Sequence, residues 1–343
     1  MSLETAWLGV LGLMLAGYFV LGGYDYGVQM LHPFLGGPRE DQQAERSGQN
    51  PALDAIAPFF LGNEVWLVAF AGVMFGAFPH LEGNLLSGLY PLLVAILAGL
   101  VLGNAAVQLR RRSRGAGARR VWDALVVVGG ALPAVCWGLV VGLLLHGVPR
   151  RADGTFHVGF GEVFHPFVLA CGTTVLLLFA AHGAAFVAVR ATEPELVDKA
   201  RQLGGRLIAV SAAAGLIALL LTLFGEGAHM TNRTTSVILA AAVFAAYGAA
   251  WWSLSTGNHV RAFVSTCLAT ALPVLLLGAG QYPYLLITKA GHGLHIDDAV
   301  TDHETLKILS VFGVFIVPTI LAYQAWSWWA FRGRTGRRHL SYF

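Results

Sequence analysis

Two acidic residues lie inside segments that are apolar enough to cross a membrane. Asp25 lies in the run Gly23–Gly27 (GYDYG), and Glu64 lies in the run Leu61–Leu67 (LGNEVWL) of the next hydrophobic segment. A carboxyl group is costly to desolvate at membrane depth, so an acidic side chain there needs a specific reason. Two of them on neighbouring antiparallel helices indicate either proton transfer or a specific polar contact.

Other polar residues accompany these acids. Asp54 lies at the start of the same predicted span as Glu64, about two turns before Leu61, so that Asp54 and Leu61 lie on nearly one helix face. Asn63 and Trp66 flank Glu64 with hydrogen-bonding groups. Together with the acid of the first span, Asp54 and Glu64 could carry protons inward from the cytoplasm. Alternatively, each acid is neutral and bonds a neighbouring backbone or side-chain group, and the residues alone leave both readings open.

The composition requires a membrane environment for these segments. Hydrophobic residues make up 56% of the chain and charged residues 12%, with a mean hydropathy of +0.64. A soluble domain carries about twice that charged fraction, and a helix needs about 20 apolar residues to cross the hydrocarbon core. The sequence therefore predicts an all-α integral membrane protein with nine transmembrane helices. They run roughly over residues 7–31, 53–78, 85–109, 122–146, 163–189, 204–225, 236–256, 260–280 and 306–331.

No soluble domain fits between these spans. We expect a single polytopic membrane domain over residues 1–343, with a first helical half at about 1–150 and a second half plus final helix at about 151–343. The longest gap, at about 281–305, is predicted to be a loop. Glu4 and the lack of a basic stretch before the first span predict that this span is retained rather than cleaved as a signal peptide.

The distribution of basic residues predicts the orientation. With the amino terminus outside, 17 of the 22 Lys and Arg fall on the cytoplasmic side, so the positive-inside rule favours N-out and C-in. Asp25 then lies roughly 9–15 Å and Glu64 roughly 16 Å from the cytoplasmic surface, which are similar depths. The basic run Arg110–Arg120 is interpreted as a topology determinant that meets lipid headgroups, and no nucleic-acid partner is expected. The remaining cytoplasmic basic residues are Arg39, Arg46, Arg261, the four between Arg190 and Arg206, and the four between Arg332 and Arg338.

The histidines and cysteines do not form a pattern that predicts a heme or metal site in this chain. A transmembrane bis-His heme site needs two imidazoles at similar depth, whereas His182 is the only histidine well inside a predicted span. His182 is therefore interpreted as a hydrogen-bonded packing residue. Cys136, Cys171 and Cys267 lie singly in apolar segments and are interpreted as buried thiols.

Several motifs, in order along the whole chain, resemble subunit II of cytochrome bd-type quinol oxidases. The second-span motif is fairly specific, and the others gain weight jointly. The matching pieces are Gly23–Gly27, Ala57-Pro58 with Gly62–Leu67, His182–Ala184 with Arg190–Thr192, Tyr282-Pro283, and Thr305–Ile308 with Tyr323–Trp326.

The resemblance implies both an architecture and an activity. The family is similar to two four-helix bundles plus one extra helix, in a bacterial plasma (inner) membrane. The complex would be a respiratory terminal oxidase that oxidises quinol and reduces dioxygen to water. Heme b and heme d would be held by the partner, subunit I, and small accessory membrane subunits are expected. The second subunit would act as a scaffold, with quinone or quinol binding and proton conduction as further expected roles; Tyr24, Asn63, Trp66 and His182 would support its motifs.

One departure from the family pattern concerns protons. The family usually has an aromatic-Asp pair before the Gly-Asn-Glu/Gln-Val-Trp motif, and Phe60-Leu61 stands there in this chain. The resemblance associates that Asp, with the first-span Asp, with a proton path toward the oxygen-reducing heme. Asp54 could substitute for it, water could bridge past Leu61, or protons could come through the partner subunit.

Two other function classes fit the apolar composition. A secondary transporter would place its substrate near the bilayer midplane at broken helices, and Pro133, Pro273 and Pro318 could break spans. A purely structural membrane partner is the other class. A reduced-minus-oxidised visible spectrum of the chain purified with its partners would separate these classes from an oxidase.

The predicted orientation can be tested by cysteine labelling. An impermeant thiol reagent should label a cysteine at residue 153, in a predicted outer loop, and should spare one at residue 116 in intact cells. Labelling of both after permeabilisation is the control. The reverse pattern in intact cells would overturn the topology.

Overall fold

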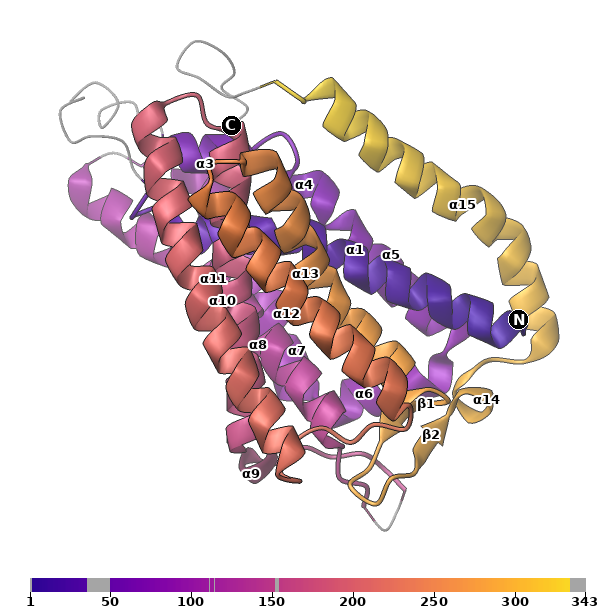
Figure 1. The fold of residues 1–343 in the computed structure, drawn as a ribbon. Coiled ribbons are helices and arrows are strands. Elements are labelled where there is room, and N and C mark those ends of the chain that lie inside the picture. Colours follow the sequence, from indigo (N-terminus) through magenta and orange to yellow (C-terminus); the bar gives the residue numbers. More distant parts are fainter. Residues whose placement is uncertain (1, 36–49, 111, 114, 152–153, 334–343) are drawn as a thin grey trace.

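The computed structural model describes residues 2–35, 50–110, 112–113, 115–151 and 154–333 (Figure 1). Within these ranges nine helical segments are long and apolar enough to cross a membrane, as predicted. The second of them consists of two helices in direct succession. The segments are α1 (Leu3–Leu31), α4 with α5 (Phe60–Asn63, Val65–Ala77), α7 (Tyr90–Arg110), α8 (Ala116–His146), α10 (Pro166–Arg190), α11 (Pro194–Leu223), α12 (Arg233–Ser255), α13 (His259–Gln281) and α15 (His303–Ala330).

The second span differs from the predicted continuous helix over 53–78. A short helix, α3 (Pro51–Ile56), ends before Pro58, and α4 starts only at Phe60. Proline lacks a backbone N–H and disfavours helical geometry in the residue before it, which accounts for the break. Asp54 and Leu61 therefore do not share one helix face, and that prediction is wrong. At the other end, α6 (Pro79–Gly88) precedes α7, so the third span begins at Tyr90 rather than at 85.

The region predicted to be a loop at 281–305 is partly structured. Strands β1 (Tyr284–Ile287) and β2 (Gly293–His295) pair antiparallel, with Leu286 opposite Leu294. Two short helices complete the described elements, α14 (Ile296–Ala299) after this hairpin and α9 (Phe160–Val163) before α10. A Cβ at Gly293 would meet the Leu286 carbonyl oxygen at 1.9 Å, so the hairpin requires glycine there.

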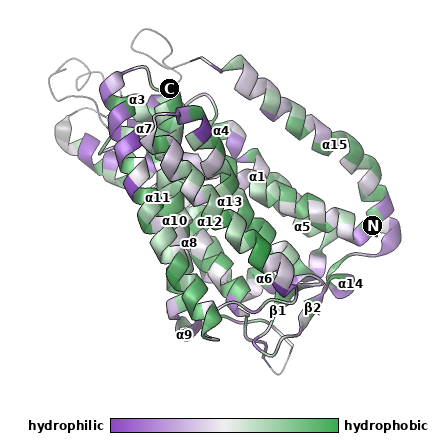
Figure 2. Ribbon diagram, viewed as in Figure 1, coloured by the Kyte–Doolittle hydropathy of each residue, from purple (hydrophilic) through white to green (hydrophobic). Residues whose placement is uncertain are grey.

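Helix α1 lies at the centre of the packing and contacts α5, α8, α10 and α13. Helices α7 and α8 pack together, as do α10 with α11 and α12 with α13. Figure 2 shows hydrophobic residues along the bodies of the helices and hydrophilic residues gathered toward the helix ends and the connections. The grouping into two four-helix bundles and the N-out, C-in orientation stay predictions, as does the division into halves near residue 150.

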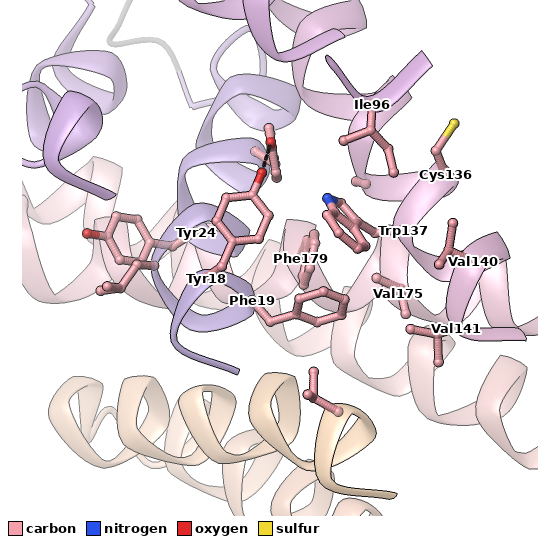
Figure 3. Close-up of a cluster of buried hydrophobic side chains, with 14 of the residues drawn as sticks. Tyr18, Phe19, Tyr24, Ile96, Cys136, Trp137, Val140, Val141, Val175 and Phe179 are labelled. Carbon is pink, nitrogen blue, oxygen red and sulfur yellow. Dashed lines mark hydrogen bonds between the residues drawn. The ribbon is translucent and has the colours of Figure 1, made fainter. Parts of the chain in front are cut away.

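An aromatic cluster joins α1 to α8 and α10. Phe19 lies 5.4 Å, centroid to centroid, from both Trp137 and Phe179, and Tyr18 lies 5.7 Å from Trp137. Figure 3 shows these rings gathered together, while Tyr24 points to a different side of α1. All of them are buried, so the cluster fixes the rotation of α1 about its own axis.

Helix α15 is attached along one narrow seam. Only 6% of its most apolar window is buried, and Figure 1 shows it running apart from the other helices along its length. The indole N–H of Trp7 donates to the Ser310 hydroxyl at 3.0 Å, and the indole N–H of Trp66 donates to Oε1 of Gln324 at 3.1 Å. These two bonds tie α15 to α1 and α5.

Part of the predicted topology evidence falls outside the described residues. Residue 153 lies outside them. The exposed Glu226 and Asp198 are described positions for the same labelling experiment, on the predicted outer and cytoplasmic sides respectively. The basic residues outside the described ranges are Arg39, Arg46, Arg111, Arg114, Arg334, Arg337 and Arg338.

Two glycines allow α1 and α10 to approach closely, and this contact can be tested. A Cβ on Gly27 would lie 2.0 Å from the Phe179 carbonyl oxygen, and one on Gly183 would lie 2.5 Å from the Gly27 carbonyl carbon. Gly27→Ala should destabilise the purified complex by about 1–3 kcal/mol, because rigid backbone must move. Gly9→Ala, on the same helix with no atom within 4 Å of its Cβ, is the matched control. Equal melting temperatures for the two variants would contradict the close-packing interpretation.

Candidate functional site

Asp25 is buried within the protein and is held by a side chain from the second span. Its side chain is 4% exposed, and its Oδ2 accepts a hydrogen bond from Nδ2 of Asn63 at 2.8 Å. The same amide nitrogen donates to the Tyr24 hydroxyl at 2.7 Å. Among the described residues, Oδ1 of Asp25 has no hydrogen-bond partner, and neither has Oδ1 of Asn63. The site therefore combines one fixed contact with a carboxyl oxygen that can still bind a proton and an amide oxygen that can still accept a hydrogen bond.

Local packing explains why these groups meet. Tyr24 stacks on Phe186 with a centroid separation of 4.2 Å, which orients the hydroxyl at the end of its ring toward α4. Asn63 is the last residue of α4 and is 1% exposed. A buried amide without such partners would be strongly unfavourable, so the register of α4 against α1 is coupled to this contact.

The partner of Glu64 comes from another helix and not from the flanking residues Asn63 and Trp66. The side-chain amide of Asn104, on α7, donates a hydrogen bond to Oε1 of Glu64. Trp66 does not bond Glu64, because its indole N–H donates to Gln324 on α15. Glu64 is half-buried and follows Asn63 directly in the sequence, and Asn63 bonds Asp25. Asn63 therefore connects the acids of the first two spans, one by a hydrogen bond and the other along the chain.

His182 has both ring nitrogens engaged. Nδ1 lies 2.8 Å from the Thr266 hydroxyl, and Nε2 lies 2.9 Å from the Val20 carbonyl oxygen. The ring is fully buried and stacks on Phe263 at 5.1 Å. Since a carbonyl oxygen only accepts, Nε2 carries a proton and is not free to coordinate iron. This geometry supports the interpretation of His182 as a packing residue that links α10, α13 and α1.

Asp54 and Leu61 lie apart from this buried group. Asp54 is half-buried on α3, and Leu61, on α4, is 58% exposed. Because the position that carries the acid in the resembling family points out of the protein here, a path along it would follow the outer face of the second span rather than its core.

Three groups that the sequence did not single out belong to the same region. Asn104 bonds Glu64, Gln29 is 1% exposed, and His32 is 1% exposed and bonds Asp123. A signal for two of them was present, because residues 25, 29 and 32 repeat with helical spacing on one face of α1. Asn104 and Asp123 could not be assigned from spacing, because each lies in a different helix.

Three further histidines lie close together where α8 ends and α10 begins. The rings of His146 and His165 stack at 4.1 Å, and His229 lies 6.0 Å from His146. Burial, together with the positive charge of Lys289, lowers the pKa of the His229 imidazole below its ordinary value. Within the described ranges, no three or more His, Cys, Asp or Glu are arranged to hold a metal ion.

Comparisons with known proteins cover nearly the whole chain. The family model described as cytochrome bd terminal oxidase subunit II matches residues 3–331. The chain is 27% identical to cytochrome bd ubiquinol oxidase subunit 2 of Bacillus subtilis, over 98% of each chain. It is 26% identical to cytochrome bd-I ubiquinol oxidase subunit 2 of Escherichia coli K12, over 97% of this chain and 95% of the other. The solved bd oxidase from Geobacillus thermodenitrificans contains a similar fold, with a TM-score of 0.70 at 17% identity, over 97% of this chain and 100% of the other.

The contact between Asn63 and Asp25 should contribute measurably to stability. Asn63→Ala removes the amide that bonds Asp25 and Tyr24, and a buried polar group left unsatisfied costs about 1–3 kcal/mol. The melting temperature of the complex should fall accordingly. Asn84→Ala is the control, because Asn84 bonds only the backbone of its own helix at His80. An Asn63→Ala complex as stable as Asn84→Ala would mean that the contact is not structural.

Proposed function

The chain belongs to the family of cytochrome bd terminal oxidase subunit II, and from this premise we propose that it conducts protons through a path containing Asp25, Asp54 and Glu64. It is a multi-pass membrane subunit of a quinol:oxygen oxidoreductase complex, whose other main component is subunit I. The three prolines on which the transporter alternative rested do not break their spans, because Pro133, Pro273 and Pro318 lie inside helices that continue through them.

One observation carries the proton-conducting role. Asp25 is a buried carboxyl group whose Oδ2 is held by Asn63 and whose Oδ1 has no partner in the described part of the chain. Holding one oxygen fixes the position of the group, while the other oxygen remains able to bind and release a proton. A carboxyl group used only as a structural contact would gain from having both oxygens satisfied.

Glu64 extends this path toward the surface of the subunit. It lies half-buried between α5 and α7 with Asn104 as its donor. Next to it, Val65 and Val68 are 43% and 69% exposed on the same helix. An acid beside an apolar face inside the membrane is better placed against protein than against lipid. Subunit I is therefore proposed to cover this face and to receive the proton there.

The hemes are proposed to belong to subunit I. Heme b and heme d need axial ligands, and His182 is already bonded at both nitrogens. Quinone or quinol binding by this chain is proposed only as a contact of α15, where Tyr323, Trp326 and Trp329 expose aromatic rings. A bacterial plasma (inner) membrane location and small accessory subunits are carried over as expectations of the family.

Asp25→Asn tests the proton-conducting role directly. The substitution keeps the shape and the contact with Asn63 but cannot ionise, so the quinol-oxidase rate of the complex should fall by about tenfold or more. Heme content and melting temperature should stay at the unmodified level. Asp198→Asn, in an exposed pair with Arg201, is the matched control and should not change the rate. Normal turnover of Asp25→Asn across the pH range would leave Asp25 with a structural role alone.

The assignment of the hemes has its own test. The isolated subunit should show no heme absorbance in a reduced-minus-oxidised spectrum, whereas the complex with subunit I should show it. The physical reason is that His182, the histidine well inside a span, has both ring nitrogens engaged by groups of this chain. Stoichiometric heme on the isolated chain would refute this assignment.

A further inference from the structure

A buried histidine, an acid and an arginine meet where α1, α7 and α8 end on the same side. Nε2 of His32 lies 3.1 Å from Oδ1 of Asp123, and Nε of Arg110 donates to the same oxygen. His32 is 1% exposed, whereas the Asp123 side chain is 31% exposed. Positive-inside counting predicts that this end faces the cytoplasm. Asp123 therefore joins a buried imidazole to the solvent side.

The hydrogen bonds of His32 require a shared proton. Nδ1 lies 2.8 Å from the Gln29 backbone carbonyl oxygen, which can only accept, so Nδ1 carries a proton. The contact between Nε2 and Asp123 then needs a second proton, either on the ring or on the carboxyl group. In both arrangements the pair holds one exchangeable proton between two atoms 3.1 Å apart.

Helix geometry places His32 on the same face of α1 as Asp25. Asp25, Gln29 and His32 lie one turn apart in succession on the same face of α1, so that Asp25 and His32 are about 10 Å apart along the axis. Gln29 is buried, and its Oε1 has no partner among the residues that the structure describes. Glycines on α7 and α8 make room for it, since a Cβ on Gly103 would come within 2.5 Å of Gln29 Oε1 and one on Gly130 within 2.8 Å of its Cβ.

Buried polar atoms without a hydrogen-bond partner lie between Asp25 and the pair formed by His32 and Asp123. Oε1 of Gln29 and Oδ1 of Asp25 are buried acceptors without a partner among the described residues. Buried polar atoms of this kind are ordinarily satisfied by ordered water. Both atoms lie on the face of α1 that also carries His32, so water bound at them would stand between His32 and Asp25.

We propose that Asp123 and His32 form the proton-loading pair of this subunit, and that Gln29 orients the water through which the proton reaches Asp25. The proposal rests on the proton-conducting role proposed above. The shared proton leaves the pair for water at Gln29 and ends on Oδ1 of Asp25. Its release leaves Nε2 of His32 facing a carboxylate, two acceptors in contact, which favours reloading from the solvent through Asp123.

This route explains how the chain can lack the acid expected at position 61. Leu61 lies on the exposed face of the second span, whereas the route through Gln29 lies in the core between α1, α7 and α8. The charged group facing the pair from α7 is Arg110, and from the loop before α3 the Asn50 amide donates to the His32 carbonyl oxygen at 3.4 Å. Of these two described neighbours, neither is an acid.

The test uses the purified complex of both subunits with Asp123→Asn, Asp123→Glu and His32→Gln. Asp123→Asn can still accept from Arg110 but carries no exchangeable acid proton. Its quinol-oxidase turnover should fall by about tenfold, as should that of His32→Gln, while Asp123→Glu should recover most of the rate. Heme spectra and melting temperature should match the unmodified complex, and Asp198→Asn should be silent.

Two readouts separate proton loading from a structural ion pair. The loss of quinol-oxidase turnover in Asp123→Asn should become larger as the pH rises. Without the acid, protons must reach Gln29 directly from hydronium in solution, and the hydronium concentration falls with rising pH. Acetate or formate, small enough to reach the partly exposed position, should restore turnover by carrying protons to His32. A structural defect would respond to neither treatment.

The outcomes distinguish this proposal from the proposed function. If Asp25→Asn lowers turnover while Asp123→Asn and His32→Gln do not, the conduit exists and its loading site lies elsewhere, with a slow Asp54→Asn pointing to α3. If Asp25→Asn is itself silent, the conduit through this subunit is refuted. If Asp123→Asn loses turnover without pH dependence or rescue by weak acid, its role is structural and the loading pair is refuted.

Discussion

A carboxyl group at membrane depth must find its hydrogen-bond partners inside the protein, and this constraint organises the centre of the molecule. Asp25 finds a donor in Asn63, and that single amide sets the register between α1 and α4 while holding Tyr24. Because α1 also packs on α5, α8, α10 and α13, an error in its rotation would propagate to each of them. The aromatic cluster around Phe19 holds the same rotation from the opposite side of the helix.

Apolar length predicted the nine spans well, because no other structure accommodates so many long hydrophobic runs. The break at Pro58 was missed because hydropathy averages over a window and merges a short helix with its neighbour. The hairpin at β1 and β2 was missed because its strands are only four and three residues long. Asp25, Asn63 and Glu64 could be chosen by residue type, but Asn104 and Asp123 could not be assigned as their neighbours, since partners from separate helices leave no local pattern.

The buried polar groups differ in whether this chain alone supplies their hydrogen-bond partners and their cover. His182 is satisfied at both nitrogens by groups of this chain, which makes it a rigid joint between three helices. Glu64 and its donor Asn104 lie beside an exposed apolar face. They become fully buried only when another molecule covers α5 and α7. Helix α15 is also largely exposed. It is attached by the indole N–H donors of Trp7 and Trp66 and by the Trp328 ring, which stacks on Phe59 and Phe263. The core of the subunit is thus self-contained, whereas its periphery is built for assembly.

The polar interruption of the second span has a consequence for biosynthesis. Its most apolar window has a mean hydropathy of 1.5, the lowest among the spans of the described residues, and it contains both Asn63 and Glu64. Such a segment partitions weakly from the translocon into lipid by itself. Pairing with Asp25 of the already emerged first helix satisfies the side-chain N–H group of Asn63, so the two segments are better inserted as a hairpin than one at a time. The contact that holds Asp25 in the proposed proton path would then also act as an early step in membrane integration, and a substitution there would alter protein yield before it altered turnover.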